Sequence, residues 1–218
     1  MTPRIVGPVT SLPSNRSGAS SALALLLVLL LVLVLVLAAP AKSQSWAPLV
    51  RAPRWPDRTF NAVRVWIQPS SSITHWTPAH VEAARDAFIS WSRVEIGVPF
   101  TFVADSAVAE IGVRWTDRFD EPISGHTRAD HDAAFWIVRA SLDLAVRHHS
   151  GVVLDNDAMR AIALHEVGHA LGLEHLPDST SVMAPAVRAR ALTAADRAAA
   201  LRLYEFRDST ASAPRPHR

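Results

Sequence analysis

The chain contains no cysteine, one lysine and one tyrosine in its 218 residues. Without cysteine no disulfide forms, so stability must come from a packed core. The scarcity of lysine and tyrosine also explains the sequence pI of 9.9, because almost nothing titrates between histidine and arginine. The high pI therefore reflects a gap in titrating groups and does not indicate a basic surface.

A large excess of one charge is also missing. The formal net charge is +2, which equals the contribution of Arg4 and Arg16 near the amino terminus, so the rest of the chain is close to neutral. The one dense group of cations, Arg188-Ala189-Arg190, is typical of a solvated loop. We therefore expect no nucleic-acid partner, because an electrostatic basis for binding one is absent.

A long hydrophobic run occurs once, over the eighteen residues 22–39, and small residues follow at Ala39, Ala41 and Ser43. Residues 1–45 therefore form either an export signal, whose cleavage the small residues favour, or an amino-terminal membrane anchor, because the run is just long enough to cross a bilayer. In the first case the protein is secreted. In the second it is attached to a membrane through residues 22–39, with its remaining part outside the cytoplasm.

The chain after this segment, about 170 residues, is long enough for one domain with a substantial core. Residues 46–58 are rich in proline and tryptophan, and we interpret them as an extended lead-in or a short propeptide. Residues 59–208 form the single predicted domain, and the polar residues 209–218 are predicted to be a disordered tail. No internal repeat is apparent, and we expect a monomer.

The first half of this domain predicts a strand followed by a helix. Val63, Val65 and Ile67 alternate with Arg64, Trp66 and Gln68, which is typical of a half-buried strand. Thr77 and Pro78 then provide the cap and the first turn of a helix. The apolar stripe of that helix consists of Val81, Ala84, Phe88 and Trp91.

The second half predicts further strands and two more helices. Strands are expected at residues 101–103, 111–115 and 135–142. Asp155 caps a helix that runs to about Leu173, and its buried face consists of Met159, Ala163, Val167 and Leu171. Thr193 and Asp196 resemble a capping box at the start of a last helix that ends at Tyr204.

The most informative stretch is residues 165–175, which read His-Glu-Val-Gly-His-Ala-Leu-Gly-Leu-Glu-His. On a helix, residues four apart share one face, so the rings of His165 and His169 reach a single ion. Glu166 is rotated by about 100° from His165 and reaches toward a water molecule instead of the metal. Gly172 accepts positive φ, which lets the helix stop and brings His175 back to the same ion.

Three histidine ligands leave a fourth tetrahedral position open, which is typical of a catalytic zinc and not of a structural one. Zinc lowers the pKa of water at that position to about 7. His165, His169 and His175 are therefore the predicted ligands of one catalytic Zn²⁺, and Glu166 is the predicted general base.

The stretch resembles the extended motif of the metzincin zinc peptidases, in which a methionine turn follows the third histidine. Ser181-Val182-Met183-Ala184-Pro185 is similar to that turn in the matrixin branch. The resemblance implies an α+β fold with an α/β-type upper subdomain: a twisted mixed sheet, two long helices, the methionine turn and a carboxyl-terminal helix. It also implies that Met183 forms a hydrophobic floor beneath the metal without binding it.

Two departures from the resemblance concern latency and additional metals. Because the chain has no cysteine, the cysteine switch of many matrixins is impossible here, which makes the resemblance a bacterial-type one. Vertebrate matrixins also bind calcium and a structural zinc through a loop rich in histidine and aspartate. The local candidates, His126, Asp130, His131 and Asp132, do not reproduce that pattern, and we expect them in a solvated loop. We make no prediction about metal ions other than the catalytic zinc.

The resemblance implies a zinc metalloendopeptidase that acts on extracytoplasmic proteins or peptides, with the substrate extended along an edge strand. Residues 123–128 are the candidate edge and residues 135–142 its inner neighbour, although the reverse assignment stays open. Glu174 lies at a variable motif position and is expected to face solvent. Two alternatives are a non-catalytic, anchored zinc-binding module and a zinc hydrolase of a small amide or ester.

Overall fold

The computed structural model describes residues 52–58 and 61–205. The predicted export signal or anchor, the first residues of the lead-in and the predicted tail lie outside the described residues. Within the described ranges, no helix has the length and apolar character needed to cross a membrane.

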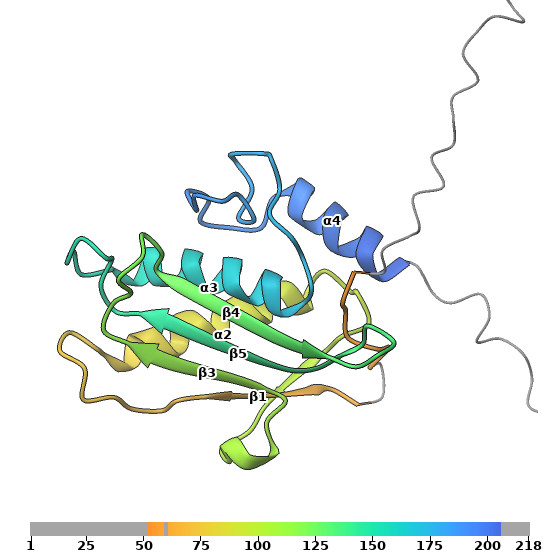
Figure 1. Cartoon of the computed structure of the whole chain (residues 1–218), viewed down its shortest axis with the longest axis horizontal. Helices are drawn as coiled ribbons and strands as arrows, with labels where there is room; N and C mark the ends of the chain where they lie inside the picture. Colours follow the sequence, from red (N-terminus) through yellow and green to blue (C-terminus); the bar gives the residue numbers. More distant parts are fainter. Residues whose placement is uncertain (1–51, 59–60, 206–218) are drawn as a thin grey trace, which may run out of the picture. The chain divides into compact units, whose positions relative to one another are not determined.

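A single five-stranded sheet forms the base of the domain (Figure 1). Its strands are β1 (Val63–Ile67), β2 (Phe100–Phe102), β3 (Ile111–Thr116), β4 (Gly125–His131) and β5 (Ile137–Ala145), arranged in the order β2-β1-β3-β5-β4. The strands β2, β1, β3 and β5 pair in parallel in this order, whereas β4 pairs antiparallel to β5. Strand β4 therefore lies at an edge of the sheet with β5 as its inner neighbour, as expected, although it covers residues 125–131 and not the expected 123–128.

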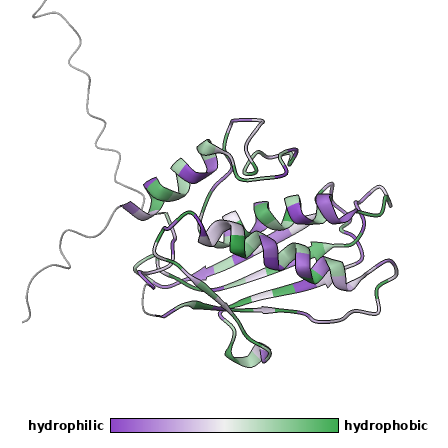
Figure 2. Ribbon diagram, turned by 180° about the vertical axis from the view of Figure 1, so that it is seen from behind, coloured by the Kyte–Doolittle hydropathy of each residue, from purple (hydrophilic) through white to green (hydrophobic). Residues whose placement is uncertain are grey.

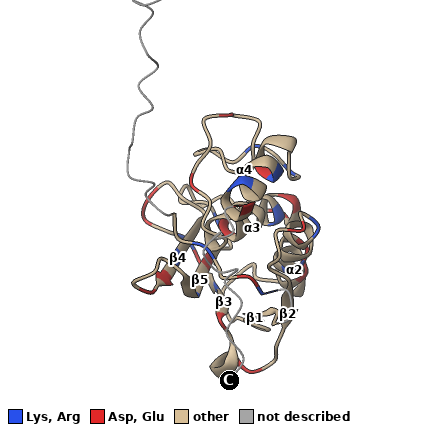
Figure 3. Cartoon of the chain, turned by 90° about the vertical axis from the view of Figure 1, so that its right-hand side faces the viewer, with Lys and Arg blue, Asp and Glu red and all other residues tan. Residues whose placement is uncertain are grey.

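Two helices, α2 (Pro78–Ser92) and α3 (Asn156–Ala170), cover one face of the sheet, and α4 (Ala194–Glu205) lies on the far side of α3. Figure 2 shows the helical layer from behind, with the sheet beneath it. Burial alternates along β1, where Val63, Val65 and Ile67 are buried beneath the helices. In the cartoon of Figure 3, acidic and basic residues are mixed along these helices. The mixed sheet and its helices confirm the α+β fold.

The predicted helix starts are confirmed, and several ends differ by a few residues. Thr77 precedes α2, and the Asp155 side chain accepts a hydrogen bond from Ala158 N at the start of α3. Helix α3 ends at Ala170, three residues before the predicted Leu173. Strand β5 begins at Ile137 and not at Phe135, because Phe135 has a φ of 62° and belongs to the turn between β4 and β5.

The prediction of a solvated loop at residues 126–132 is wrong for three of its four named residues. His126, Asp130 and His131 belong to strand β4, and Asp132 follows it. His126 pairs with Asp143 and Asp130 with Arg139 across the ladder to β5. His126 and Asp130 are exposed because alternate positions of an edge strand face solvent, and His131 follows an irregularity of the ladder between Asp130 and His131. Their polarity therefore belongs to exposed positions of a strand and not to a loop.

Residues 52–58 pack as part of the same folded unit. Trp55 is buried, and its Nε1 donates a hydrogen bond to Ala170 O over 2.8 Å at the end of α3. Arg54 Nη1 donates to Leu203 O of α4 over 2.9 Å. Tyr204 accepts a hydrogen bond from Trp55 N and donates one to Leu171 O. This segment therefore joins the ends of α3 and α4.

Candidate metal centre

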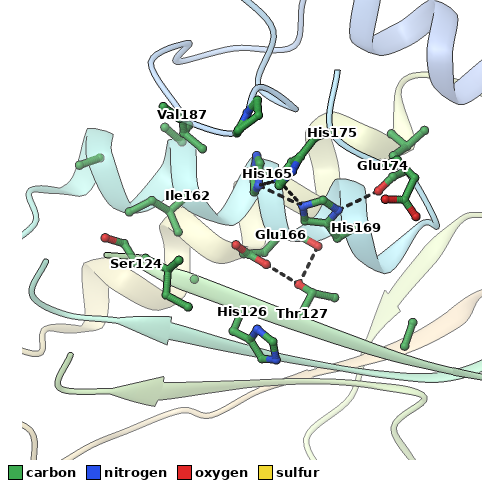
Figure 4. Close-up of a pocket in the computed structure, with 18 of the residues that line it drawn as sticks. Ser124, His126, Thr127, Ile162, His165, Glu166, His169, Glu174, His175 and Val187 are labelled. Carbon is green, nitrogen blue, oxygen red and sulfur yellow. Dashed lines mark hydrogen bonds between the residues drawn. The ribbon is translucent and has the colours of Figure 1, made fainter. Parts of the chain in front are cut away.

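The three histidines predicted as metal ligands converge on one point at the end of α3 (Figure 4). His165 and His169 stand one turn apart on the helix, and their Nε2 atoms are 3.0 Å apart. His175 Nε2 lies 3.2 Å from that of His169 and 3.3 Å from that of His165. Among the described residues, this is the one group of three or more histidines or carboxylates close enough to hold a single metal ion.

Gly172 makes the return of His175 possible for two reasons. Its φ is 93°, a conformation that side-chain-bearing residues rarely adopt, so the predicted positive φ is confirmed. In addition, a Cβ atom at this position would lie 1.9 Å from the carbonyl oxygen of Pro53. The lead-in segment thus closes directly over the turn that carries the third histidine.

The hydrogen bonds of the first two histidines fix which ring nitrogen carries the proton. His165 Nδ1 lies 2.6 Å from Val182 O, and His169 Nδ1 lies 2.7 Å from Leu173 O. Since carbonyl oxygens only accept, both Nδ1 atoms are donors. Burial lowers the pKa of His165 to about 4 and also lowers the pKa of His169, so both rings are neutral and their Nε2 atoms carry lone pairs.

Facing lone pairs repel each other unless a cation lies between them. Tetrahedral zinc ligands at 2.0–2.1 Å from the ion stand about 3.3 Å from one another, close to the observed nitrogen separations of 3.0 to 3.3 Å. Backbone carbonyls that hold the opposite ring nitrogen are the usual second layer of a histidine metal site. The donor set and its surroundings therefore fit one zinc ion.

Met183 lies directly beneath the helix that carries two of the histidines. Its side chain is fully buried. A Cβ atom at Gly168 would stand 2.2 Å from the Met183 sulfur, so the thioether occupies space that only glycine leaves open. Glycine inside a helix lowers stability by roughly 1 kcal/mol relative to alanine, and here that loss is offset by close packing of the methionine turn.

A buried carboxylate on α4 holds the methionine turn in place. Asp196 is fully buried and accepts hydrogen bonds from Ser181 Oγ and from Val182 N at 3.2 Å. It also accepts from Thr193 N and Thr193 Oγ1, each at 2.7 Å. Burial would raise the pKa of Asp196, but these donors together outweigh burial and lower it. The capping box was predicted, whereas the link from Asp196 to the turn was not.

Glu166 lies beside the histidines with its carboxylate against strand β4. Glu166 is 5% exposed, and its Oε2 accepts a hydrogen bond of 2.6 Å from Thr127 Oγ1. Burial raises the pKa of Glu166 to about 7, although the Thr127 hydrogen bond acts in the lowering direction. Sequence patterns gave no reason to select Thr127, because only the fold brings residues 127 and 166 together. Glu174, by contrast, is exposed as expected.

An open cavity of about 720 Å³ runs between α3, β4 and the loop after the methionine turn. The three histidines and Glu166 lie along its wall. In Figure 4, Ser124, Ile162 and Val187 lie on one side of the three histidines, and Glu174 lies on the other. The cavity is therefore an elongated groove, with the edge strand as one side and the histidine cluster near its middle.

Comparisons with known proteins agree with this arrangement. The family model described as Matrixin, a peptidase family, matches residues 61–205. Metalloendoproteinase 1-MMP of Arabidopsis thaliana is 32% identical over 173 residues, which cover 70% of this chain and 44% of that protein. The chain thus spans less than half the length of this relative. With the histidine cluster, the methionine turn and this match over most of the folded residues, the chain belongs to the matrixin family of metzincins.

Proposed function

We propose that the protein is a zinc-dependent endopeptidase that hydrolyses peptide bonds of extracytoplasmic proteins or peptides. The observation that carries this proposal is the placement of three converging Nε2 atoms and the Glu166 carboxylate in one elongated groove. His165, His169 and His175 would hold the ion, and Glu166 would act as the general base.

When bound, zinc polarises the carbonyl of the scissile bond and acidifies water. Glu166 accepts a proton from the water that attacks this carbonyl, and the C–N bond breaks as Glu166 passes that proton to the leaving amine. A pKa raised to about 7 by burial suits this exchange, because a group that both takes and gives a proton works best near the ambient pH.

The free edge of β4 is the proposed docking strand for an extended substrate. Among the described residues, strand β4 pairs with β5 on one side only, and its other edge lines the groove. Backbone N–H and C=O groups of an extended peptide pair with such an edge without regard to side chains. The open, elongated groove favours a polypeptide over a small amide or ester, which a closed pocket would suit better.

The proposed location is outside the cytoplasm, as a monomer, either secreted or attached through residues 22–39. Support comes from the apolar run in the sequence and from membership in a family of peptidases. A non-catalytic zinc module is disfavoured, because a structural zinc has no use for a buried carboxylate beside it.

A comparison of two glutamates tests the proposal. Residues 45–218 are purified with zinc, and cleavage of casein and of quenched peptides is measured for the parent, Glu166→Ala and Glu174→Ala. We expect zinc binding by all three, and cleavage by the parent and Glu174→Ala only. Zinc binding without any Glu166-dependent cleavage across a peptide library would exclude the endopeptidase assignment.

A further inference from the structure

The Glu166 carboxylate is seated against two small features of strand β4. Thr127 Oγ1 lies 2.6 Å from Glu166 Oε2, and Figure 4 shows the two side chains directed toward each other from β4 and α3. Two residues earlier, a Cβ atom at Gly125 would stand 2.5 Å from Glu166 Oε1. Because alternate strand residues face the same side, a gap at Gly125 and a hydroxyl at Thr127 together form what we call the carboxylate seat.

The direction of the Thr127 hydrogen bond follows from the chemistry of its partners. The hydroxyl has one proton and two acceptors in reach, Glu166 Oε2 at 2.6 Å and the Glu166 main-chain oxygen at 3.1 Å. The carboxylate contact is shorter, and hydrogen bonds to ionised acceptors are the stronger ones. With Glu166 ionised, as a general base requires, the hydroxyl therefore donates to Oε2. No hydrogen bond to Oε1 is present within residues 52–58 and 61–205, so Oε1 is left to exchange a proton.

We propose that Thr127 is a positioning residue for the general base, which holds Oε2 so that Oε1 faces the reacting water. A glutamate side chain loses rotamer freedom when it is fixed, and a misplacement of about 1 Å lowers rates by about a hundredfold. If the carboxylate seat fixes Glu166 before the substrate arrives, the loss of rotamer freedom and the misplacement no longer lower the rate of the reaction. The inference rests on the proposed function, since it assigns Glu166 the role of base.

A purely structural role for Thr127 makes a different prediction. Thr127 is half-buried on the side of β4 that faces α3. Valine has almost the same shape, has no hydroxyl to desolvate and favours strands at least as well. If Thr127 only filled space, Thr127→Val would therefore leave both stability and turnover unchanged.

The test compares Thr127→Val with Thr127→Ser, which restores the hydroxyl, and with Thr101→Val, a matched control at an exposed position of the opposite edge strand β2. We expect Thr127→Val to lower kcat about tenfold or more, with KM within about twofold and zinc content unchanged. Both other variants should match the parent. Gly125→Ala, which displaces the carboxylate without removing the hydroxyl, should also lower kcat. An unchanged kcat in Thr127→Val would overturn the proposal.

Crystal structures of the zinc-free parent and Thr127→Val provide a readout that does not depend on activity. We expect the Glu166 carboxylate to be ordered against β4 in the parent and displaced or spread over several rotamers in the variant. The same carboxylate position in both would overturn the inference. If the parent binds zinc but cleaves no peptide, the endopeptidase proposal fails, and these structures still decide whether Thr127 positions Glu166.

Discussion

Replacing Asp196 by asparagine tests how the methionine turn supports the metal centre. The side-chain oxygen of asparagine still accepts hydrogen bonds from Thr193 and Val182, but it carries no negative charge. The side-chain NH2 group takes the place of the carboxylate oxygen that faces Ser181. The Ser181 hydroxyl proton then has no acceptor. Hydrogen bonds to charged groups contribute ~1.5–3 kcal/mol, and an unsatisfied buried donor costs about 1–3 kcal/mol. We expect Asp196→Asn to lower the free energy of unfolding by about 2 kcal/mol.

For a domain of this size, this corresponds to a fall in Tm of about 6 °C. Thermal unfolding of the zinc-free protein near pH 7 measures it. Because the folded pKa of Asp196 is lowered from its ordinary value of 3.8, its contribution is present above that value and is lost as the pH falls through the lowered folded pKa. The difference between parent and variant should therefore shrink in acid. A Tm change below about 1 °C, or a difference that grows in acid, would refute this reasoning.

Three further substitutions follow from the packing around the site. Trp55→Ala should lower the free energy of unfolding by about 3–5 kcal/mol, since Trp55 is buried and hydrogen-bonded to Ala170. Denaturant unfolding measures this change. A loss below about 1 kcal/mol would show that residues 52–58 are dispensable for stability. Gly168→Ala should destabilise the protein by about 1–3 kcal/mol because its Cβ meets the Met183 sulfur. In a Met183→Ala background, which lacks that sulfur, the same substitution should lower the free energy of unfolding by less. His175→Ala should weaken zinc binding more than about a hundredfold, beyond the effect of second-layer changes; equilibrium dialysis with a zinc indicator would detect unchanged retention.

The active-site helix and its histidines were predictable because their information is local. The spacing of His165 and His169 follows from the helix repeat, and the positive φ of Gly172 follows from the need to turn the chain. Strand β1 and the start of α2 were predicted for the same reason, since alternation and a threonine–proline start are patterns of adjacent residues.

Features that depend on long-range pairing were not predictable from one sequence. The polar residues of β4 gave the pattern of a loop, and only pairing with β5 makes them the exposed face of an edge strand. Thr127 and Asp196 act through partners 39 and 14 residues away, Glu166 and Val182. Phe135 begins no strand because its φ of 62° belongs to a turn, and its aromatic side chain gives no sign of this.

The metal centre itself is tested most directly by counting zinc and its ligands. Purified residues 45–218, loaded with zinc and freed of excess, are measured by elemental analysis and X-ray absorption at the zinc edge. Convergence of the three Nε2 atoms predicts one zinc per chain, bound by three imidazole nitrogens at about 2.0–2.1 Å and one oxygen. Fewer than three imidazoles, or no retained zinc, would contradict a zinc site formed by His165, His169 and His175.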